Sequence, residues 1–112
     1  MIINTPSPPY YAIIFTALLN DDLTGYYETS ERLMELAKDY EGFYGMEEVA
    51  DKWEINISYW KDVESIMEWR NNSEHIIAQE KGKKQWYECF KMRIAKVERD
   101  YNFEKKQVAK GR

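Results

Sequence analysis

Two side chains four residues apart, Asn56 and Trp60, are the first candidates for chemistry in this sequence. They belong to the run WEINISYW over residues 53–60, whose alternating side chains predict a β-strand. Residues four apart in a strand share one face and lie about 13 Å apart. An amide donates and accepts hydrogen bonds, whereas an indole N–H only donates. Beside a pocket, this pair could hold an oxygen-bearing aromatic ring and stabilise charge that develops on it.

His75 is the single histidine, and it is the side chain whose ordinary pKa lies nearest to neutral pH. It could therefore move protons beside a substrate. All three candidates also have a structural interpretation. Asn56 would be hydrogen-bonded within the sheet and Trp60 would lie in the core, while His75 would be half-exposed and bonded to Gln79 one turn on. Cys89 is most simply a small apolar strand residue.

The elements that must position these residues follow from the pattern of apolar and turn-forming residues along the chain. Strands are predicted at residues 10–19, 43–51, 53–60 and 86–103, and helices at residues 25–38 and 62–82. Thr24 is expected to cap the first helix. A break is expected at Asn71–Ser73, where helix propensity is poor. A change of side-chain parity in the last strand predicts a β-bulge near Ala95–Lys96.

The resulting order, β-α-β-β-α-β, is the signature of a ferredoxin-like α+β sandwich with helices on one face of the sheet. The first strand, YYAIIFTALL over residues 10–19, is apolar on both of its faces. The sheet face without helices therefore needs a cover, and a second copy of the chain is the commonest one. We expect a homodimer whose sheets face each other.

Length and composition fit one folded domain, with 112 residues of which 44% are hydrophobic and 15% aromatic. We expect an extended leader at residues 1–9, the domain at 10–103 and a basic tail at 104–112. No apolar run reaches the roughly 20 residues of a membrane span, and the N-terminus lacks the pattern of a secretory signal. One cysteine and one histidine do not support an internal disulfide or a zinc site. The expectation is a reduced, cytoplasmic, metal-free domain with no membrane partner.

Charge is divided unevenly along the chain. Residues 1–80 carry 5 basic and 16 acidic side chains, whereas residues 81–112 carry 11 basic and 4 acidic ones. A basic segment can bind nucleic acid, but the acidic remainder would repel phosphate, so we expect no nucleic-acid partner. The favoured interpretation is that the basic segment lies against acidic surface, its own or that of a second copy. The alternative is that these charges are simply solvated.

The stretch from Ile57 to Tyr101 resembles the antibiotic biosynthesis monooxygenase (ABM) family, in particular a YqjZ-like bacterial branch of it. The features that carry the resemblance, which extends over residues 10–103, are Tyr59-Trp60, Trp69, Glu74-His75, Ala78, Gly82 and the long final strand. The resemblance implies a ferredoxin-like protomer, a dimeric α+β barrel and a pocket between sheet and helices. Members of the family include cofactor-free oxygenases of polycyclic phenols or quinols, haem-degrading enzymes and signal-processing enzymes.

Asn56 and Trp60 match the N-x-x-x-W pattern of the quinol-oxidising members. The resemblance implies that Asn56 holds a substrate oxygen or a reduced oxygen species, and that Trp60 donates its N–H and packs on the ring. Those members have a Tyr six residues after the Trp, where this chain has Ile66, which with Trp69 is expected beside the substrate. Haem-degrading relatives use a helix His with an Asn and a Trp. His75 is a candidate for that ligand, but the first strand has no Asn to complete the set.

The sequence therefore favours a cofactor-free monooxygenase of a small phenol or quinol. Asn56, Trp60 and His75 would be its catalytic residues, and Ile66 and Trp69 would bind the substrate. Haem degradation ranks lower. The main alternative is a non-catalytic dimeric module on the same fold, ligand-binding or stress-related, in which Asn56 and Trp60 only pack. The two differ in whether the pocket is polar enough to orient a substrate.

Overall fold

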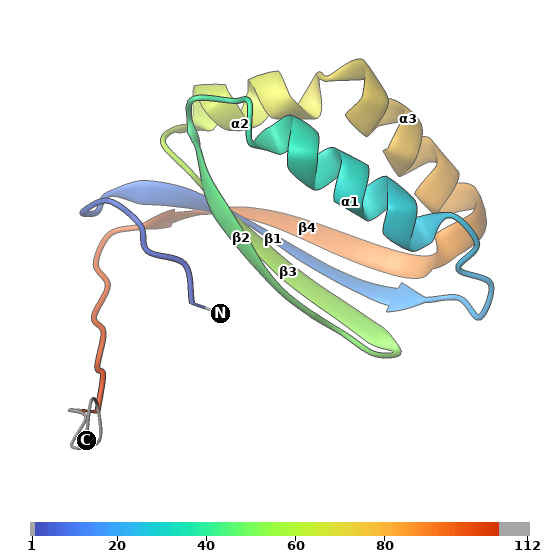
Figure 1. Ribbon diagram of the computed structural model, residues 1–112, viewed down its shortest axis with the longest axis horizontal. Helices are drawn as coiled ribbons and strands as arrows, with labels where there is room; N and C mark the ends of the chain where they lie inside the picture. Colours follow the sequence, from blue (N-terminus) through green and yellow to red (C-terminus); the bar gives the residue numbers. More distant parts are fainter. Residues whose placement is uncertain (1, 106–112) are drawn as a thin grey trace, which may run out of the picture.

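A computed structural model describes residues 2–105 of the chain. Four antiparallel strands form one sheet in the order β2-β3-β1-β4, and the helices lie together on one side of it (Figure 1). The elements are β1 (Tyr10–Leu19), α1 (Tyr26–Ala37), β2 (Phe43–Ala50), β3 (Trp53–Trp60), α2 (Val63–Arg70), α3 (Ser73–Lys81), the π-helical turn η1 (Gly82–Trp86) and β4 (Tyr87–Val97). With α2 and α3 in the place of the second helix, this order confirms the predicted ferredoxin-like α+β sandwich.

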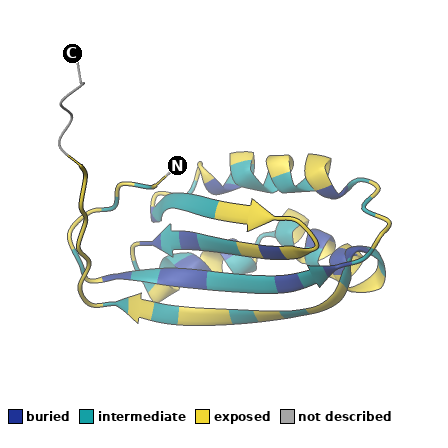
Figure 2. Ribbon diagram, turned by 90° about the horizontal axis from the view of Figure 1, so that it is seen from below, coloured by how far each residue is buried: buried dark blue, intermediate teal, exposed yellow. Residues whose placement is uncertain are grey.

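The central strand β1 organises the sheet, because it pairs with β3 on one side and with β4 on the other. Its β-branched and aromatic residues suit a position between two neighbours. Ile13 and Ala17 are buried on the side of the helices. The opposite face of the sheet has no helix over it, and Figure 2 shows that face with many half-buried and exposed residues. The described residues of one copy thus leave the outer face open.

Aromatic side chains hold the helices to the sheet. Trp60 of β3 and Ile66 of α2 have no exposed surface, and they share one core cluster with Ile13, Ala37 and Trp69. The rings of Trp60 and Trp69 stack with 6.1 Å between their centroids. Burying large aromatic surface in this way supplies most of the stabilisation that a chain of this size can gain.

The helical region between β3 and β4 breaks at residues 71–72, as the sequence predicts. Asn72 caps α3, because its Oδ1 atom accepts hydrogen bonds from the backbone N–H groups of Glu74 (2.9 Å) and His75 (3.2 Å). Its Nδ2 atom donates to the Tyr40 hydroxyl at 3.0 Å. The same side chain therefore begins α3 and ties it to the segment that follows α1.

The predicted cap of α1 is wrong. The N-cap residue is Gly25, whose φ of 80° lies in the left-handed region that favours glycine. Thr24 instead closes the preceding turn, since its backbone N–H and its hydroxyl donate to Asp22 Oδ1 at 3.0 and 2.7 Å. Local hydrogen bonding to an aspartate competes here with capping of the helix.

The predicted course of the last strand is also wrong in two respects. β4 ends at Val97 rather than at residue 103, and its register against β1 runs without interruption past Ala95 and Lys96. The irregularity lies at the other end of the strand, where Leu18 pairs with Cys89 but Leu19 pairs with Tyr87. The parity change seen in the sequence is not a bulge: Val97 pairs with Tyr10 in an unbroken register and so lies on the other face of β4, whereas Tyr101 lies beyond the end of the strand.

The segments before and after the sheet are extended. In the leader, the backbone N–H of Ile3 donates to Glu47 at 2.8 Å, and the Ile3 side chain fills the space above Gly45. After β4, Asp100 accepts a hydrogen bond of 2.6 Å from the Tyr10 hydroxyl. Of the predicted basic tail at 104–112, residues 106–112 lie outside the described part of the chain.

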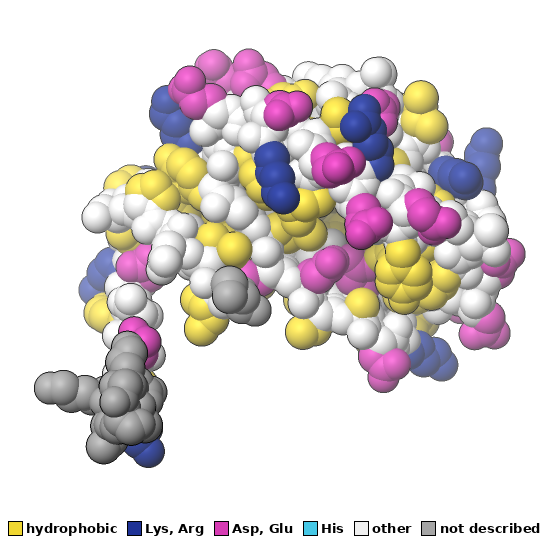
Figure 3. All heavy atoms as spheres, in the orientation of Figure 1, with side chains coloured by type: hydrophobic (Ala, Val, Ile, Leu, Met, Phe, Trp, Pro, Cys, Tyr) yellow, Lys and Arg dark blue, Asp and Glu magenta, His cyan; other side chains and the backbone are white. Residues whose placement is uncertain are grey.

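Charged side chains of both signs are mixed over the face shown in Figure 3. Within residues 2–105, that view shows no continuous basic stripe of the kind that follows a nucleic-acid backbone. No helix in the same residues is long and apolar enough to cross a membrane.

Replacing the cap of α3 should destabilise the fold measurably. Asn72→Ala removes the acceptor for two backbone N–H groups and the bond to Tyr40, so we expect the free energy of unfolding to fall by about 1–2 kcal/mol. Asn71→Ala is the matched control because Asn71 is exposed, and it should change stability by less than about 0.5 kcal/mol. Urea unfolding followed by circular dichroism measures both, and equal effects would contradict the capping role.

Candidate functional site

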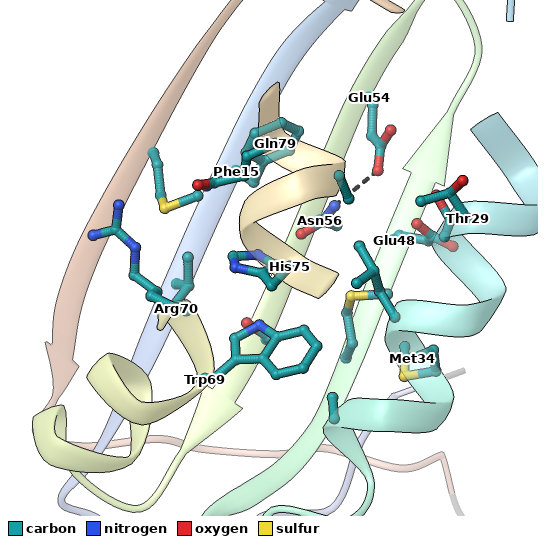
Figure 4. Close-up of a pocket in the computed structure, with 18 of the residues that line it drawn as sticks. Phe15, Thr29, Met34, Glu48, Glu54, Asn56, Trp69, Arg70, His75 and Gln79 are labelled. Atoms are coloured by element: carbon teal, nitrogen blue, oxygen red, sulfur yellow. Dashed lines mark hydrogen bonds between the residues drawn. The ribbon is translucent and has the colours of Figure 1, made fainter. Parts of the chain in front are cut away.

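A cavity of about 150 Å³ lies between the sheet and the helices (Figure 4). Its floor is formed by the inward faces of β1, β2, β3 and β4, and its other walls come from α1, α2 and α3. Most of the lining is apolar, including Phe15, Met34, Trp69 and Phe90. A small, largely apolar hollow with a few polar groups is the usual form of a small-molecule site.

Four of the five sequence-predicted site residues line this cavity, namely Asn56, Trp60, Trp69 and His75. The strand and helix periods therefore bring them together as expected, Asn56 and Trp60 on the inward face of β3 and the other two from the helices. The structure does not bring Ile66 to the wall. Ile66 is fully buried in the core cluster with Trp60 and Trp69, where it supports the residues that form the wall.

Asn56 makes a contact that was not predicted. Its Nδ2 atom donates a 2.8 Å hydrogen bond to the Oε2 atom of Glu54, two residues earlier on the same face of β3 (Figure 4). One amide proton of Asn56 is therefore bound to a neighbouring carboxylate. This hydrogen bond holds the Glu54 carboxylate in place at the cavity wall.

The indole of Trp60 is also bound within the protein. Its Nε1 atom donates to the Ser58 hydroxyl at 2.8 Å, and the side chain has no exposed surface. This differs from the expected role, in which the N–H donates to a substrate, because an indole has only this one donor. In this structure Trp60 contributes an apolar face, stacked on Trp69, rather than a free donor.

His75 lies in the first turn of α3, with its ring centroid 4.8 Å from that of Trp69. Its Nδ1 atom is buried and has no hydrogen-bond partner, and Gln79, the alternative partner expected from the sequence, lines the same cavity. Burial lowers the pKa of His75, a hydrogen bond with the Arg70 backbone partly opposes this, and the charge of Arg70 adds a smaller lowering effect. These effects together favour the neutral imidazole, whose Nδ1 atom has no partner.

Glu54 is the residue that sequence reasoning missed most clearly. It is only 3% exposed, and its Oε1 atom has no hydrogen-bond partner. Burial raises the pKa of this carboxyl group, while the hydrogen bond from Asn56 opposes the rise. A signal was present in the sequence, because Glu54 has the same strand parity as Asn56 and Trp60.

Arg70 is a second residue that the sequence analysis did not predict as part of the site. It ends α2 and lines the cavity, and its Nε atom is buried without a partner. Figure 4 shows Arg70 on one side of His75 and Glu54 on the other. Its spacing of four residues from Ile66, on one helical stripe, could have indicated that it points inward.

At the Glu54 end of the cavity, further groups affect the electrostatics. Burial raises the pKa of Tyr87, and the negative charges of Glu54 and Glu48 raise it further. The Tyr87 hydroxyl is thus held in its neutral form beside two carboxylates. One end of the cavity is acidic, and the other holds a cation and a neutral imidazole.

The three unpartnered atoms, Glu54 Oε1, Arg70 Nε and His75 Nδ1, all belong to residues that line this one cavity. A buried polar atom without a partner costs about 1–3 kcal/mol, so native proteins rarely keep one without a purpose. Within residues 2–105, no three His, Cys, Asp or Glu side chains lie close enough together to hold a metal ion.

Comparison with known proteins finds relatives by sequence and neighbours by fold. No protein-family model matches it. It is 47% identical over 102 residues to the uncharacterized protein YqjZ of Bacillus subtilis, covering 89% of this chain and 90% of that protein. A stretch of 45 residues, 40% of this chain and 21% of the relative, is 36% identical to the jasmonate monooxygenase ABM of Pyricularia oryzae. The fold matches that of SnoaB, a cofactor-independent oxygenase from Streptomyces nogalater, with a TM-score of 0.66 and 8% identity over 92% of this chain and 99% of that one.

The chain belongs to the antibiotic biosynthesis monooxygenase family. The resemblance inferred from the sequence is confirmed, including its YqjZ-like branch. In this ABM protein the N-x-x-x-W residues, Asn56 and Trp60, both lie at the cavity wall. One amide N–H of Asn56 and the Trp60 indole N–H are bonded to Glu54 and Ser58, however, so these two donors are not free in the cavity.

The raised pKa of Glu54 predicts how stability depends on pH. A carboxyl group whose pKa is higher in the folded state binds protons more tightly there, so its contribution to stability falls as pH rises through that pKa. We expect Glu54→Gln to remove this fall, so that the melting temperature of the variant gains on that of the wild type as pH rises from the ordinary glutamate pKa of about 4.3 to the higher pKa of the folded state, and the difference is constant above it. The exposed Glu35→Gln is the control, and parallel pH profiles for wild type and Glu54→Gln would refute the assignment.

Proposed function

We propose that this ABM protein is a monooxygenase that needs no metal or organic cofactor and acts on a small phenol or quinol. The observation that carries the proposal is the set of three buried polar atoms without partners, on Glu54, Arg70 and His75, in one largely apolar cavity. Such groups orient a ligand with polar atoms at its edge and are costly to keep in a cavity that only packs. The similarity in fold to a cofactor-independent oxygenase supports the same class of reaction.

Size limits the substrate to one aromatic ring in this form of the cavity. Its volume is about 150 Å³, which in another protein is enough to hold benzene. Sites for larger ligands commonly measure about 300–1,000 Å³. Polycyclic phenols and haem therefore do not fit without movement of the walls. His75 offers a free nitrogen that could bind haem iron, but the residues present leave no space for the macrocycle.

A one-ring hydroquinone meets the chemical requirements of such a reaction. With dioxygen it gives a hydroxyquinone and water, so the substrate itself supplies the electrons and the atoms balance. The protein would contribute a dry cavity and fixed polar groups that favour the anionic ring. In this scheme Trp60 and Trp69 pack against the ring, Arg70 and His75 contact an oxygen, and His75 assists proton movement. Ile66 does not contact the ring in this scheme. It packs in the core cluster with both indoles and supports their positions.

A non-catalytic ligand-binding module remains the second candidate, and one observation favours it. The Trp60 indole N–H and an Asn56 amide N–H, which an oxygenase of the quinol-oxidising type would offer to its substrate, are bonded to Ser58 and Glu54. A binding module would use the same cavity without consuming oxygen. The experiment below separates the two, because binding and oxygen uptake are measured on the same variants.

We propose that the protein works as a homodimer through the open face of its sheet. That face carries exposed apolar side chains toward its β2 edge, among them Val49, Trp53 and Ile55. The β4 edge adds the exposed Lys91 and Arg93, paired with β1 residues on that face. A basic edge and an apolar patch suit association with an acidic copy of the same chain. We place the dimer in the reducing cytoplasm, where the exposed thiol of Cys89 stays reduced.

Oxygen uptake tests the enzyme directly. We expect uptake by metal-free protein with one-ring hydroquinones, and little with polycyclic phenols or with haem and a reductant. Arg70→Met removes a donor from the cavity, so the KM for a hydroquinone should rise about ten- to a hundredfold. Arg32→Met is the control because Arg32 forms an exposed ion pair with Glu74. Hydroquinone binding without oxygen uptake would favour the binding module, and an unchanged KM in Arg70→Met would remove Arg70 from the site.

A charge placed in the open sheet face should break the dimer. Ile55 is 41% exposed on that face, and we expect Ile55→Lys to give folded monomers in sedimentation velocity. Ile76→Lys on α3 is the matched control, since Ile76 is 46% exposed on the helical side. If attraction between the basic edge of one copy and acidic surface on the other contributes to association, salt should weaken the wild-type dimer. A dimer that survives Ile55→Lys unchanged would show that association uses another surface.

A further inference from the structure

We propose that Glu54 is the general base of this cavity: its free Oε1 atom takes the proton of a substrate hydroxyl while Asn56 holds the other carboxylate oxygen. The inference rests on the proposed function, because a phenol or quinol is the ligand that brings the hydroxyl. It adds a catalytic role to a residue outside the N-x-x-x-W pattern, and it makes Asn56 a positioning residue.

The geometry favours one free oxygen on Glu54. The side chain is 3% exposed and lines the cavity, so bulk water does not solvate it. Oε2 accepts the 2.8 Å hydrogen bond from Asn56 Nδ2, and Oε1 has no partner (Figure 4). The two residues lie on the same face of β3, which makes the orientation of the carboxylate rigid. A fixed, unpartnered oxygen in a dry cavity is an acceptor that a hydroxyl donor completes.

The surroundings also suit a proton acceptor. Burial raises the pKa of Glu54 above its ordinary value and brings it closer to neutral, where a general base is most effective. Groups from every neighbouring element share the cavity with it: Tyr26 of α1, Glu48 of β2, Arg70 of α2, His75 of α3 and Tyr87 of β4. Of these, Arg70 supplies the positive charge, and the lowered pKa of His75 keeps that ring neutral.

The proton balance is simple. The O–H bond of the substrate breaks, a new O–H bond forms on Glu54 Oε1, and no electrons are gained or lost in this step. The negative charge passes from the carboxylate to the ring oxygen, so the net charge of the cavity does not change. Arg70 lies on the opposite side of His75 from Glu54 (Figure 4) and favours the anion that forms. The anionic ring is then the species that reacts with dioxygen.

Two variants test this assignment without relying on activity alone. Glu54→Gln keeps the shape and the acceptor for Asn56 but cannot take a proton, whereas Glu54→Asp keeps a base and withdraws it from the substrate. The probe for binding is 4-methylphenol, which stays neutral below about pH 9 because its hydroxyl resembles that of tyrosine. Titration calorimetry between pH 5 and pH 8 gives its affinity. The exposed Glu35→Gln is the control for the charge change.

For the wild type we expect the affinity for 4-methylphenol to rise about tenfold as Glu54 ionises, because a charged acceptor binds a hydroxyl more strongly than a neutral one. Glu54→Gln should bind with no such rise, Glu54→Asp should show a smaller rise because its carboxylate is withdrawn, and Glu35→Gln should retain the full rise. In turnover of a hydroquinone, Glu54→Gln should lower kcat about a hundredfold or more with a smaller change in KM, and it should lose the acidic limb of the pH profile.

The outcomes separate this inference from the proposed function. A pH-dependent affinity that Glu54→Gln abolishes, without oxygen uptake by any form, would keep Glu54 as the proton acceptor and overturn the oxygenase. Oxygen uptake that Glu54→Gln leaves unchanged would keep the oxygenase and overturn the role of Glu54. Absence of 4-methylphenol binding, or a pH dependence that is equal in wild type and Glu54→Gln, would also overturn it.

Discussion

The stack of Trp60 on Trp69 is the contact on which the rest of the structure depends. It joins the end of β3 to α2, with 6.1 Å between the ring centroids and no exposed surface on Trp60. Ile66 of α2 packs in the same cluster, so the distance between α2 and the sheet follows from this packing. His75 then lies 4.8 Å from Trp69, so the position of α3 follows from the same stack. A second cluster, formed by Leu19, Tyr26 and Trp86, also packs between the layers, and residues of both clusters line the cavity.

Polar groups in the wall of the cavity work against stability. Glu54, Arg70 and His75 each keep a buried atom without a partner, in a chain short enough that every buried group matters. A sequence selected for stability alone would place apolar residues at these positions. Strain of this kind is typical of sites where a ligand supplies the missing partners. The hydrogen bond from Asn56 to Glu54 limits the cost, since it satisfies one of the two carboxylate oxygens.

Local patterns predicted much of the fold and part of the candidate site. Alternation in residues 53–60 placed Asn56 and Trp60 on one face, and poor helix propensity at Asn71–Ser73 located the break between α2 and α3. The burial of Glu54 was not predicted, because a glutamate at the start of a strand is ordinarily solvated and only tertiary packing buries it. The hydrogen bonds of Trp60 and Asn56 depend on side-chain rotamers, which no periodicity specifies. The misplaced bulge had a different origin, since Val97, an apolar residue on the other face of β4, was interpreted as a change of parity.

The two faces of the sheet divide packing and chemistry between them. Because successive strand residues point to opposite sides, Glu54 and Asn56 face the cavity while Ile55 and Ile57 face outward. A single strand therefore serves the site and the proposed interface. On the outer face, Lys91 and Arg93 lie along the β4 edge, and Glu47 pairs with Ile57 at the β2 edge. A two-fold axis along the strands would lay the basic edge of one copy over the acidic edge of the other. The uneven charge along the sequence would then be a consequence of how the sheet orders its strands, with β2 and β4 at opposite edges.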